Sequence, residues 1–159
     1  MKVRDLMTKT VAYCRPETNL AAAGALMWEN DCGVLPVVDD SGKAAGILTD
    51  RDICIALSTR NRPPSDITAR EVAASRTLTC GADDDIHVAL ETMRREKVHR
   101  LPVVNRAGAL EGILSMNDIV LRAEKGNGKK EPEVSYDDVV NTFQALSAHR
   151  PAQRQAVTA

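Results

Sequence analysis

The chain has 159 residues with 21 basic and 22 acidic side chains, which gives a formal net charge of −1. This balance offers no electrostatic attraction to nucleic acid or to an anionic membrane, and four aromatic residues are too few for a base-stacking surface. No apolar run is long enough to cross a bilayer, and no signal-like segment follows Met1. We therefore expect a cytoplasmic protein with a core of ordinary size and without nucleic acid or membrane as a partner.

The chain repeats itself after 66 residues. Residues 35–38 and 101–104 both read Leu-Pro-Val-Val, and residues 46–48 and 112–114 both read Gly-Ile-Leu. Over residues 3–57 this shift produces 14 identities without a gap. Such a repeat predicts two similar halves that pack together. Both copies also keep a hydroxyl and a carboxylate three residues apart, at Thr49 and Asp52 and at Ser115 and Asp118.

Each copy predicts the element order β-α-β-β-α, and hence an α/β (α+β) fold of two units packed together. In the first copy a short apolar strand at 10–13 precedes a helix with an apolar face, for which Thr18 is the expected N-cap. Strands at 35–38 and 45–48 follow, joined by a turn with a glycine, and a second helix begins near Thr49. The face of the first helix carries Leu20, Ala23 and Met27.

The second copy predicts strands at 77–80, 101–104 and 110–114 and a second helix beginning near Ser115. Its first helix, with Asp85 as the expected N-cap, carries Ile86, Ala89, Leu90 and Met93 on its apolar face. Strands that are apolar without alternation predict a sheet covered on both faces. We expect the first unit at 1–60, a connector at 61–68, the second unit at 69–124 and a C-terminal extension at 125–159.

The extension begins with a polar linker and continues with a helix capped by Ser135, whose apolar stripe is Val139, Val140, Phe143 and Leu146. We favour packing of this stripe against the same chain or its symmetry mate, the alternative being a docking helix for a separate protein. From 149 to 159 we expect disorder.

No motif indicates catalysis or a metal site. Cys14, Cys32, Cys54 and Cys80 form no C-x-x-C pair, lie in apolar contexts and are interpreted as small hydrophobic residues, not as a disulfide frame or zinc site. His87 and His149 stand alone, and no nucleophile and base have a recognisable spacing. We therefore expect that the protein is not an enzyme.

The repeated Thr/Ser-x-x-Asp pairs have two interpretations. A hydroxyl and a carboxylate with this spacing at a helix start form the capping box, which needs no ligand. The same helix start also exposes backbone N–H groups that favour phosphate, and its carboxylate can accept hydrogen bonds from two ribose hydroxyls. Because Gly-Ile-Leu-Thr/Ser-x-x-Asp-Ile occurs twice at equal offset, we favour ligand binding.

With its Leu-Pro-Val-Val strands, glycine-bearing turns and Gly-Ile-Leu-Thr/Ser-x-x-Asp motifs, residues 1 to about 123 resemble a tandem of cystathionine-β-synthase (CBS) domains, the stand-alone CBS pair or Bateman module. The stretch from 98 to 118 also resembles the adenylate-sensing gamma subunits of AMP-activated protein kinase. The resemblance implies two units packed around a pseudo-twofold axis that leave two clefts. These would take AMP, ADP or ATP, before NAD or S-adenosylmethionine, as a regulatory ligand, with no obligatory cofactor. It further implies a homodimer that signals through an unidentified effector protein or through the C-terminal segment.

Carried over to this sequence, the resemblance assigns Thr49 and Asp52 to a first cleft and Ser115 and Asp118 to a second. Arg51 and Asn117, between the paired residues, would face phosphate, and Met116 is also assigned to the ligand. The apolar walls for adenine would lie near Val11 and Leu78 and in the two Leu-Pro-Val-Val strands. His99 and Arg100 of the second copy, which replace Gly33 and Val34 of the first, would contact phosphate, so we expect the two halves to differ in phosphate preference. The alternative is that Lys97 and Arg100 are solvated ends of a helix-to-strand turn, where cations near a helix C-terminus are favourable. The alternative function is a dimerisation or interaction module with vestigial clefts.

Overall fold

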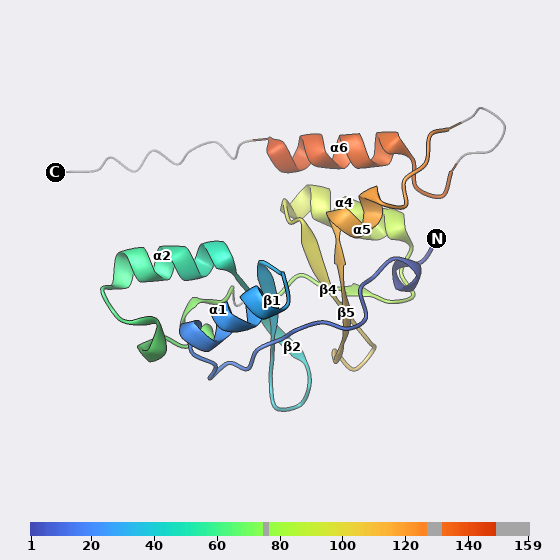
Figure 1. Ribbon diagram of the computed structural model, residues 1–159. Helices are drawn as coiled ribbons and strands as arrows, with labels where there is room; N and C mark the ends of the chain where they lie inside the picture. The colour runs from blue at the N-terminus through green and yellow to red at the C-terminus, as the bar shows by residue number, and fades with distance from the viewer. Residues whose placement is uncertain (75–76, 127–131, 149–159) are drawn as a thin grey trace.

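The computed structural model describes residues 1–74, 77–126 and 132–148 (Figure 1). The first unit holds α1 (Leu20–Glu29), β1 (Val34–Val38), β2 (Ala44–Thr49) and α2 (Asp50–Arg60). The second holds β3 (Cys80–Gly81), α4 (Ile86–Glu96), β4 (Arg100–Val104), β5 (Leu110–Ser115) and α5 (Met116–Val120). Short elements precede them at η1 (Val3–Asp5), η2 (Pro64–Asp66) and α3 (Ala69–Val72), and α6 (Tyr136–Ser147) follows them.

The two units repeat one sheet geometry. β1 pairs with β2 antiparallel, and β4 pairs with β5 in the same register, so that Leu35 lies opposite Leu48 and Leu101 opposite Leu114. The turns between these strands contain the expected glycines, at positive φ in both units, a backbone conformation that favours glycine. The predicted α/β fold and its β-α-β-β-α order are therefore confirmed for the second unit and, apart from its first strand, for the first.

The first strand of each copy is shorter than predicted. Instead of a strand at 10–13, the first unit has a single parallel bridge between Cys14 and Val37, and β3 begins only at Cys80. Cys14 N–H donates to the Pro36 carbonyl and its own carbonyl accepts from Val38 N–H. Extending this ladder toward residue 12 would require an N–H from Pro36, which proline lacks. Pro102 stops the ladder of the second unit in the same way.

The predicted helix faces are buried in two separate core clusters, one in each unit. All seven residues predicted for these faces are at most 5% exposed. Asp85 caps α4 as expected, accepting from the backbone of His87. The expected cap of α1 is wrong: Asn19 caps this helix through Ala22 N–H, because the Thr18 hydroxyl already accepts from Arg15 N–H in the preceding turn.

The two units exchange their leading segments. Val3 and Leu6, at the N-terminus, are buried in the core of the second unit, and Thr8 bridges to Ile113 of β5. In the same way Ile67 and Ala69 are buried in the core of the first unit, and Ala74 bridges to Ile47 of β2. Each core is thus completed by a segment that lies before the other unit in the sequence.

Reciprocal hydrogen bonds between the two hairpin turns mark the pseudo-twofold relation. Ala44 N–H donates to the Gly108 carbonyl, and Leu110 N–H donates to the Gly42 carbonyl, both over 3.2 Å. The two bonds are equivalent under the 66-residue shift.

The C-terminal helix α6 packs back on its own chain, above α4 and α5 (Figure 1). This confirms the favoured interpretation for part of the predicted stripe, because Val140 is 50% and Phe143 37% exposed. Val139 and Leu146 contact the core of the second unit, and the Arg94 guanidinium donates to the buried Thr142 hydroxyl over 3.1 Å. The expected disorder at 149–159 lies outside the described residues. No helix among the described ranges is long and apolar enough to cross a membrane.

Three of the four cysteines are at least partly buried, and burial raises the pKa of the Cys14 thiol to about 11 and that of Cys80 to about 12. Both thiols therefore stay protonated and unreactive near neutral pH. The prediction of an apolar environment is wrong for Cys54, which lies on α2 and is exposed.

Candidate functional site

A cleft of about 290 Å³ lies where the two units meet. The first unit contributes the start of β1, the end of β2 and the helix start at Thr49; the second contributes the turn between α4 and β4. The lining residues are Val34, Ile47, Thr49, Ala74, Leu78, Lys97, Val98, His99 and Arg100. Five of these side chains are aliphatic, and three carry basic nitrogen groups, namely Lys97, His99 and Arg100. None of the described lining residues is acidic. The cleft therefore suits a flat apolar group joined to an anion.

The basic residues are held by the local structure of the α4–β4 turn. Lys97 ends α4 in the left-handed conformation with φ of 55°, and Arg100 is the first residue of β4. The Lys97 ammonium donates to the Ala148 carbonyl at the end of α6 over 2.5 Å, and the His99 ring lies 6.4 Å from that of Phe143. The C-terminal helix therefore contacts two residues that line the cleft.

The Thr49 corner is a complete capping box. Asp52 Oδ2 accepts from Thr49 N–H at 3.0 Å and from the Thr49 hydroxyl at 2.6 Å, while Asp52 N–H donates to that hydroxyl. Both side chains are partly buried. Arg51 is exposed on the first turn of α2 and is not among the residues that line the cleft.

The Ser115 corner repeats this box, with Asp118 Oδ2 accepting from the Ser115 hydroxyl at 2.6 Å. Here the exchanged N-terminal segment adds the Thr8 hydroxyl, 3.4 Å from Asp118 Oδ1. The equivalent residue at the first corner is Ala74, which has no hydroxyl, so only the second carboxylate has this additional partner. Asn117 is exposed, whereas Met116 is 2% exposed and packs inside the core, where its side chain cannot meet a ligand.

A third capping box shows that this geometry alone does not identify a ligand site. Ser135 and Asp138 at the start of α6 have the same bonds, with Asp138 Oδ2 2.7 Å from the Ser135 hydroxyl, although they lie outside the repeat. What distinguishes the Thr49 corner is the cleft beside it and the bases across from it.

The structure brings together residues that the sequence assigned to different copies. His99 and Arg100 belong to the second copy and lie opposite Thr49 of the first, and Leu78 lines the same cleft. Val11 is half-buried and not among the lining residues. Lys97 was considered only as a solvated end of the turn before β4. Four further lining residues were not predicted from the sequence: Val34, Ile47, Ala74 and Val98.

The fold and the repeated motifs match one protein family. The model of the CBS domain matches this chain twice, over residues 3–59 and 66–125. The chain belongs to the CBS domain family. Its two units are consecutive CBS domains, and the structures similar to it include CBS domain pairs.

Curated relatives carry the same pair in proteins of different length. Hypoxic response protein 1 of Mycobacterium tuberculosis is 34% identical over 116 residues, which are 73% of this chain and 80% of that protein. Inosine-5'-monophosphate dehydrogenase of Mycobacterium leprae is 36% identical over 107 residues, 67% of this chain but 19% of the enzyme. The chain thus spans a small part of the dehydrogenase that it matches.

Solved structures show the same arrangement. Hypoxic Response Protein I, whose crystal structure has two coordinated zinc ions, superposes with a TM-score of 0.71 at 32% identity, covering 78% of this chain and all of that one. The CBS domain protein PAE2072 from Pyrobaculum aerophilum, complexed with AMP, has a TM-score of 0.68 at 25% identity and covers 75% of this chain and 90% of that one.

Proposed function

We propose that this CBS pair is a regulatory module without catalytic activity that binds an adenosine ligand, AMP, ADP or ATP before NAD or S-adenosylmethionine, in the cleft between its units. The observation that carries the proposal is the joining of Thr49 to Lys97, His99 and Arg100 across one cleft. The complex of PAE2072 with AMP supports it, because that protein has the same fold at 25% identity.

The lining residues come from both units and offer two kinds of contact to a ligand, apolar and positively charged. Val34, Ile47 and Leu78 offer an aliphatic slot for adenine, and the positive side chains of the α4–β4 turn offer charge-assisted hydrogen bonds to phosphate. Asp52 is not among the lining residues but is bonded to Thr49, which is. Its carboxylate can accept from ribose hydroxyls once it gives up its bond to the Thr49 hydroxyl. A ligand that carries phosphate should therefore bind more tightly than adenosine.

A ligand in this cleft touches both units and can change their packing only by binding one arrangement more tightly than another. The contacts of Lys97 and His99 with α6 supply a route for the output. Phosphate that takes the Lys97 ammonium competes with the Ala148 carbonyl and loosens the end of α6. The signal then passes through the C-terminal helix or through an effector protein that contacts it.

A thermal-shift panel with AMP, ADP, ATP, NAD and S-adenosylmethionine tests the proposal. A ligand present at 100 times its dissociation constant is expected to add about 2.7 kcal/mol to the free energy of unfolding. If none of the five ligands at millimolar concentration raises the melting temperature, the cleft is not an adenosine site.

Two alanine variants separate ribose binding from helix capping. Asp52→Ala should lose about 1 kcal/mol of stability as a broken cap and should also lose most of the ligand-induced shift. Asp138→Ala breaks the matched box at α6 and should keep that shift. Equal ligand-induced shifts in the two variants would contradict a role for Asp52 in binding.

The alternative function, dimerisation or interaction with vestigial clefts, is favoured by one observation. The hydroxyl and the carboxylate at the starts of α2 and α5 already bond each other as capping boxes, as they do at the start of α6. Under that alternative, no ligand of the panel stabilises the chain. The homodimer stays a prediction in either case, which sedimentation equilibrium checks.

A further inference from the structure

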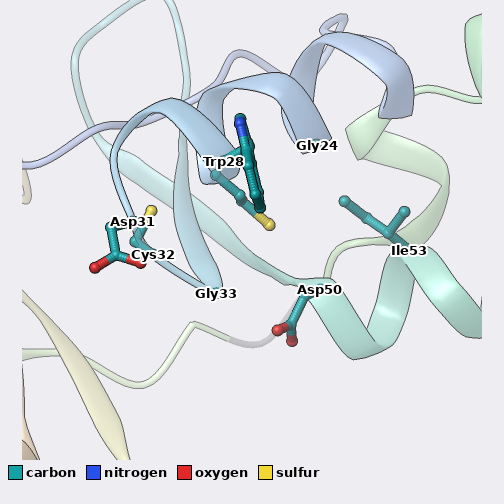
Figure 2. Close-up of a pocket in the computed structure, with 8 residues that line it drawn as sticks. Gly24, Trp28, Asp31, Cys32, Gly33, Asp50 and Ile53 are labelled. Atoms are coloured by element: carbon teal, nitrogen blue, oxygen red, sulfur yellow. The ribbon is translucent and has the colours of Figure 1, made fainter.

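A hollow of about 580 Å³ opens on the second unit between β3 with its following loop and the β4–β5 turn. This hairpin hollow is lined by residues 79–84 and 104–106 together with Arg4 and Glu111. Pockets that bind small molecules measure roughly 300–1,000 Å³, so it can hold a whole ligand. It shares no residue with the cleft between the units, nor with the hollow beside α1 and α2 that Figure 2 shows around Trp28.

The first unit shows which group this place can hold. Arg15, in the loop after the Cys14 bridge, donates from its guanidinium to the carbonyls of Val38, over 3.3 Å, and of Asp39. Its guanidinium carbon lies 5.6 Å from the centre of the Tyr13 ring, within the range of a cation–π contact. The first unit therefore binds a guanidinium group of its own between this loop and the β1–β2 turn.

The second unit keeps the acceptors of this group but lacks the group itself. Under the 66-residue shift Arg15 corresponds to Gly81, and its two acceptors correspond to Val104 and Asn105, which line the hairpin hollow. The Asn105 carbonyl accepts from Gly108 N–H at 2.9 Å, and its counterpart in the first unit makes the equivalent bond in addition to that from Arg15. A carbonyl oxygen has two lone pairs, so Asn105 can take a second donor in the same way.

Two carboxylates border the hairpin hollow where the first unit has uncharged side chains. Asp84 corresponds to Thr18, and Glu111 corresponds to Ala45. Asp84 Oδ2 accepts from Gly81 N–H at 2.7 Å, and Asp84 Oδ1 lies 3.1 Å from the point where a side chain on Gly81 would begin. The negative charge of Asp84 therefore lies beside the path that the arginine side chain takes in the first unit. Such carboxylates accept charge-assisted hydrogen bonds from a guanidinium group.

The arginine at position 4 does not oppose a cation in this place. Arg4 is already paired with Asp83. The first unit has the equivalent ion pair between Arg70 and Glu17, and there it coexists with the bound guanidinium of Arg15.

We infer that the hairpin hollow binds a free small molecule that carries a guanidinium group, of which L-arginine is the probe. The guanidinium donates to the carbonyls of Val104 and Asn105 and to the Asp84 carboxylate, in the place that Arg15 occupies in the first unit. The α-carboxylate of L-arginine meets the positive charge of Arg106 on the β4–β5 turn. This inference does not depend on nucleotide binding, because the two sites share no residue.

Isothermal titration calorimetry of the full chain with L-arginine tests the inference, and one molecule is expected to bind per chain. L-citrulline has nearly the same shape but a neutral ureido group, and it should bind at least about tenfold more weakly, a difference of about 1.4 kcal/mol. An acetylated and amidated Gly-Arg-Gly peptide presents the guanidinium without a free α-carboxylate, and it should also bind more weakly than L-arginine.

Two variants make the test specific to the hairpin hollow. Gly81→Arg supplies a guanidinium from the chain itself and should abolish the binding of L-arginine. Asp84→Thr copies the first unit, where the Thr18 hydroxyl accepts from Arg15 N–H at 2.9 Å, and should weaken binding about tenfold because a charged acceptor is lost. The matched control is Asp40→Asn, at an exposed acid of the other hairpin turn, which should bind as the wild type does.

Four outcomes would overturn the inference. L-arginine at millimolar concentration gives no binding heat, or L-citrulline binds equally well and the charge has no part in recognition. Alternatively, both Gly81→Arg and Asp84→Thr bind L-arginine as the wild type does, which would place the ligand elsewhere. Finally, tighter binding of the peptide than of L-arginine would assign the hollow to an arginine side chain of a partner protein.

Discussion

Replacing Lys97 and Arg100 together by alanine is expected to weaken the binding of AMP and ATP by about 100-fold. Each side chain lines the cleft opposite Thr49. A charge-assisted hydrogen bond contributes roughly 1.5–3 kcal/mol, and because both side chains are half-exposed, we take the lower end of this range for each. Adenosine lacks the phosphate and should lose little affinity. Isothermal titration calorimetry with the three ligands measures these changes.

The matched control for this prediction is Arg95→Ala. Arg95 lies on α4, is 62% exposed at its side chain and pairs only with neighbouring Glu96 among the bonds described. This variant should bind all three ligands as the wild type does. If adenosine and ATP lose affinity equally in the double variant, the two bases do not contact phosphate.

Gly112→Ala is expected to lower the free energy of unfolding by about 1–3 kcal/mol, the usual cost of overpacking. An added Cβ would lie 2.7 Å from the Thr8 carbonyl oxygen and 3.1 Å from the Met7 sulfur, both in the exchanged N-terminal segment. A contact this close to backbone cannot be relieved by a side-chain rotation, so the segment must move away from β5. Urea denaturation followed by circular dichroism measures the loss.

Two other glycines calibrate this result. Gly46→Ala, the equivalent position of the first unit, meets the Ala74 carbonyl at 3.2 Å and should cost less. Gly24→Ala has no atom within 4 Å of the added Cβ and lies inside α1, where the change should stabilise the chain by up to about 1 kcal/mol. If Gly112→Ala proves as stable as Gly24→Ala, the N-terminal segment does not lie against β5.

Local features of the fold were predictable because local physics determines them. The apolar faces of α1 and α4 follow from helical periodicity, and the hydroxyl and carboxylate of Thr49 and Asp52 define a helix start wherever they occur at this spacing. The 66-residue repeat added that two such units share one fold. The lengths of the first strands were overestimated. The first unit's strand is limited by the missing N–H of Pro36, which lies on β1, beyond α1 in the sequence.

The composition of the cleft was not predictable in the same way. The bases at 97–100 and the hydroxyl of Thr49 come from opposite copies, and no sequence pattern states which face of one unit meets the other. The exchange that joins Thr8 to Ile113 spans most of the chain, so its signal is absent from any short window. The sequence therefore named residues on both walls of this cleft but assigned them to separate clefts.

Photoaffinity labelling with 8-azido-AMP, followed by mass spectrometry of the labelled peptides, tests most directly whether one cleft is shared by both units. The adenine slot predicts label on both of its walls, within 34–49 of the first unit and at Leu78 or 97–100 of the second, with protection by excess AMP. Label confined to one unit, or absent from both walls, would contradict a nucleotide site between the two CBS domains.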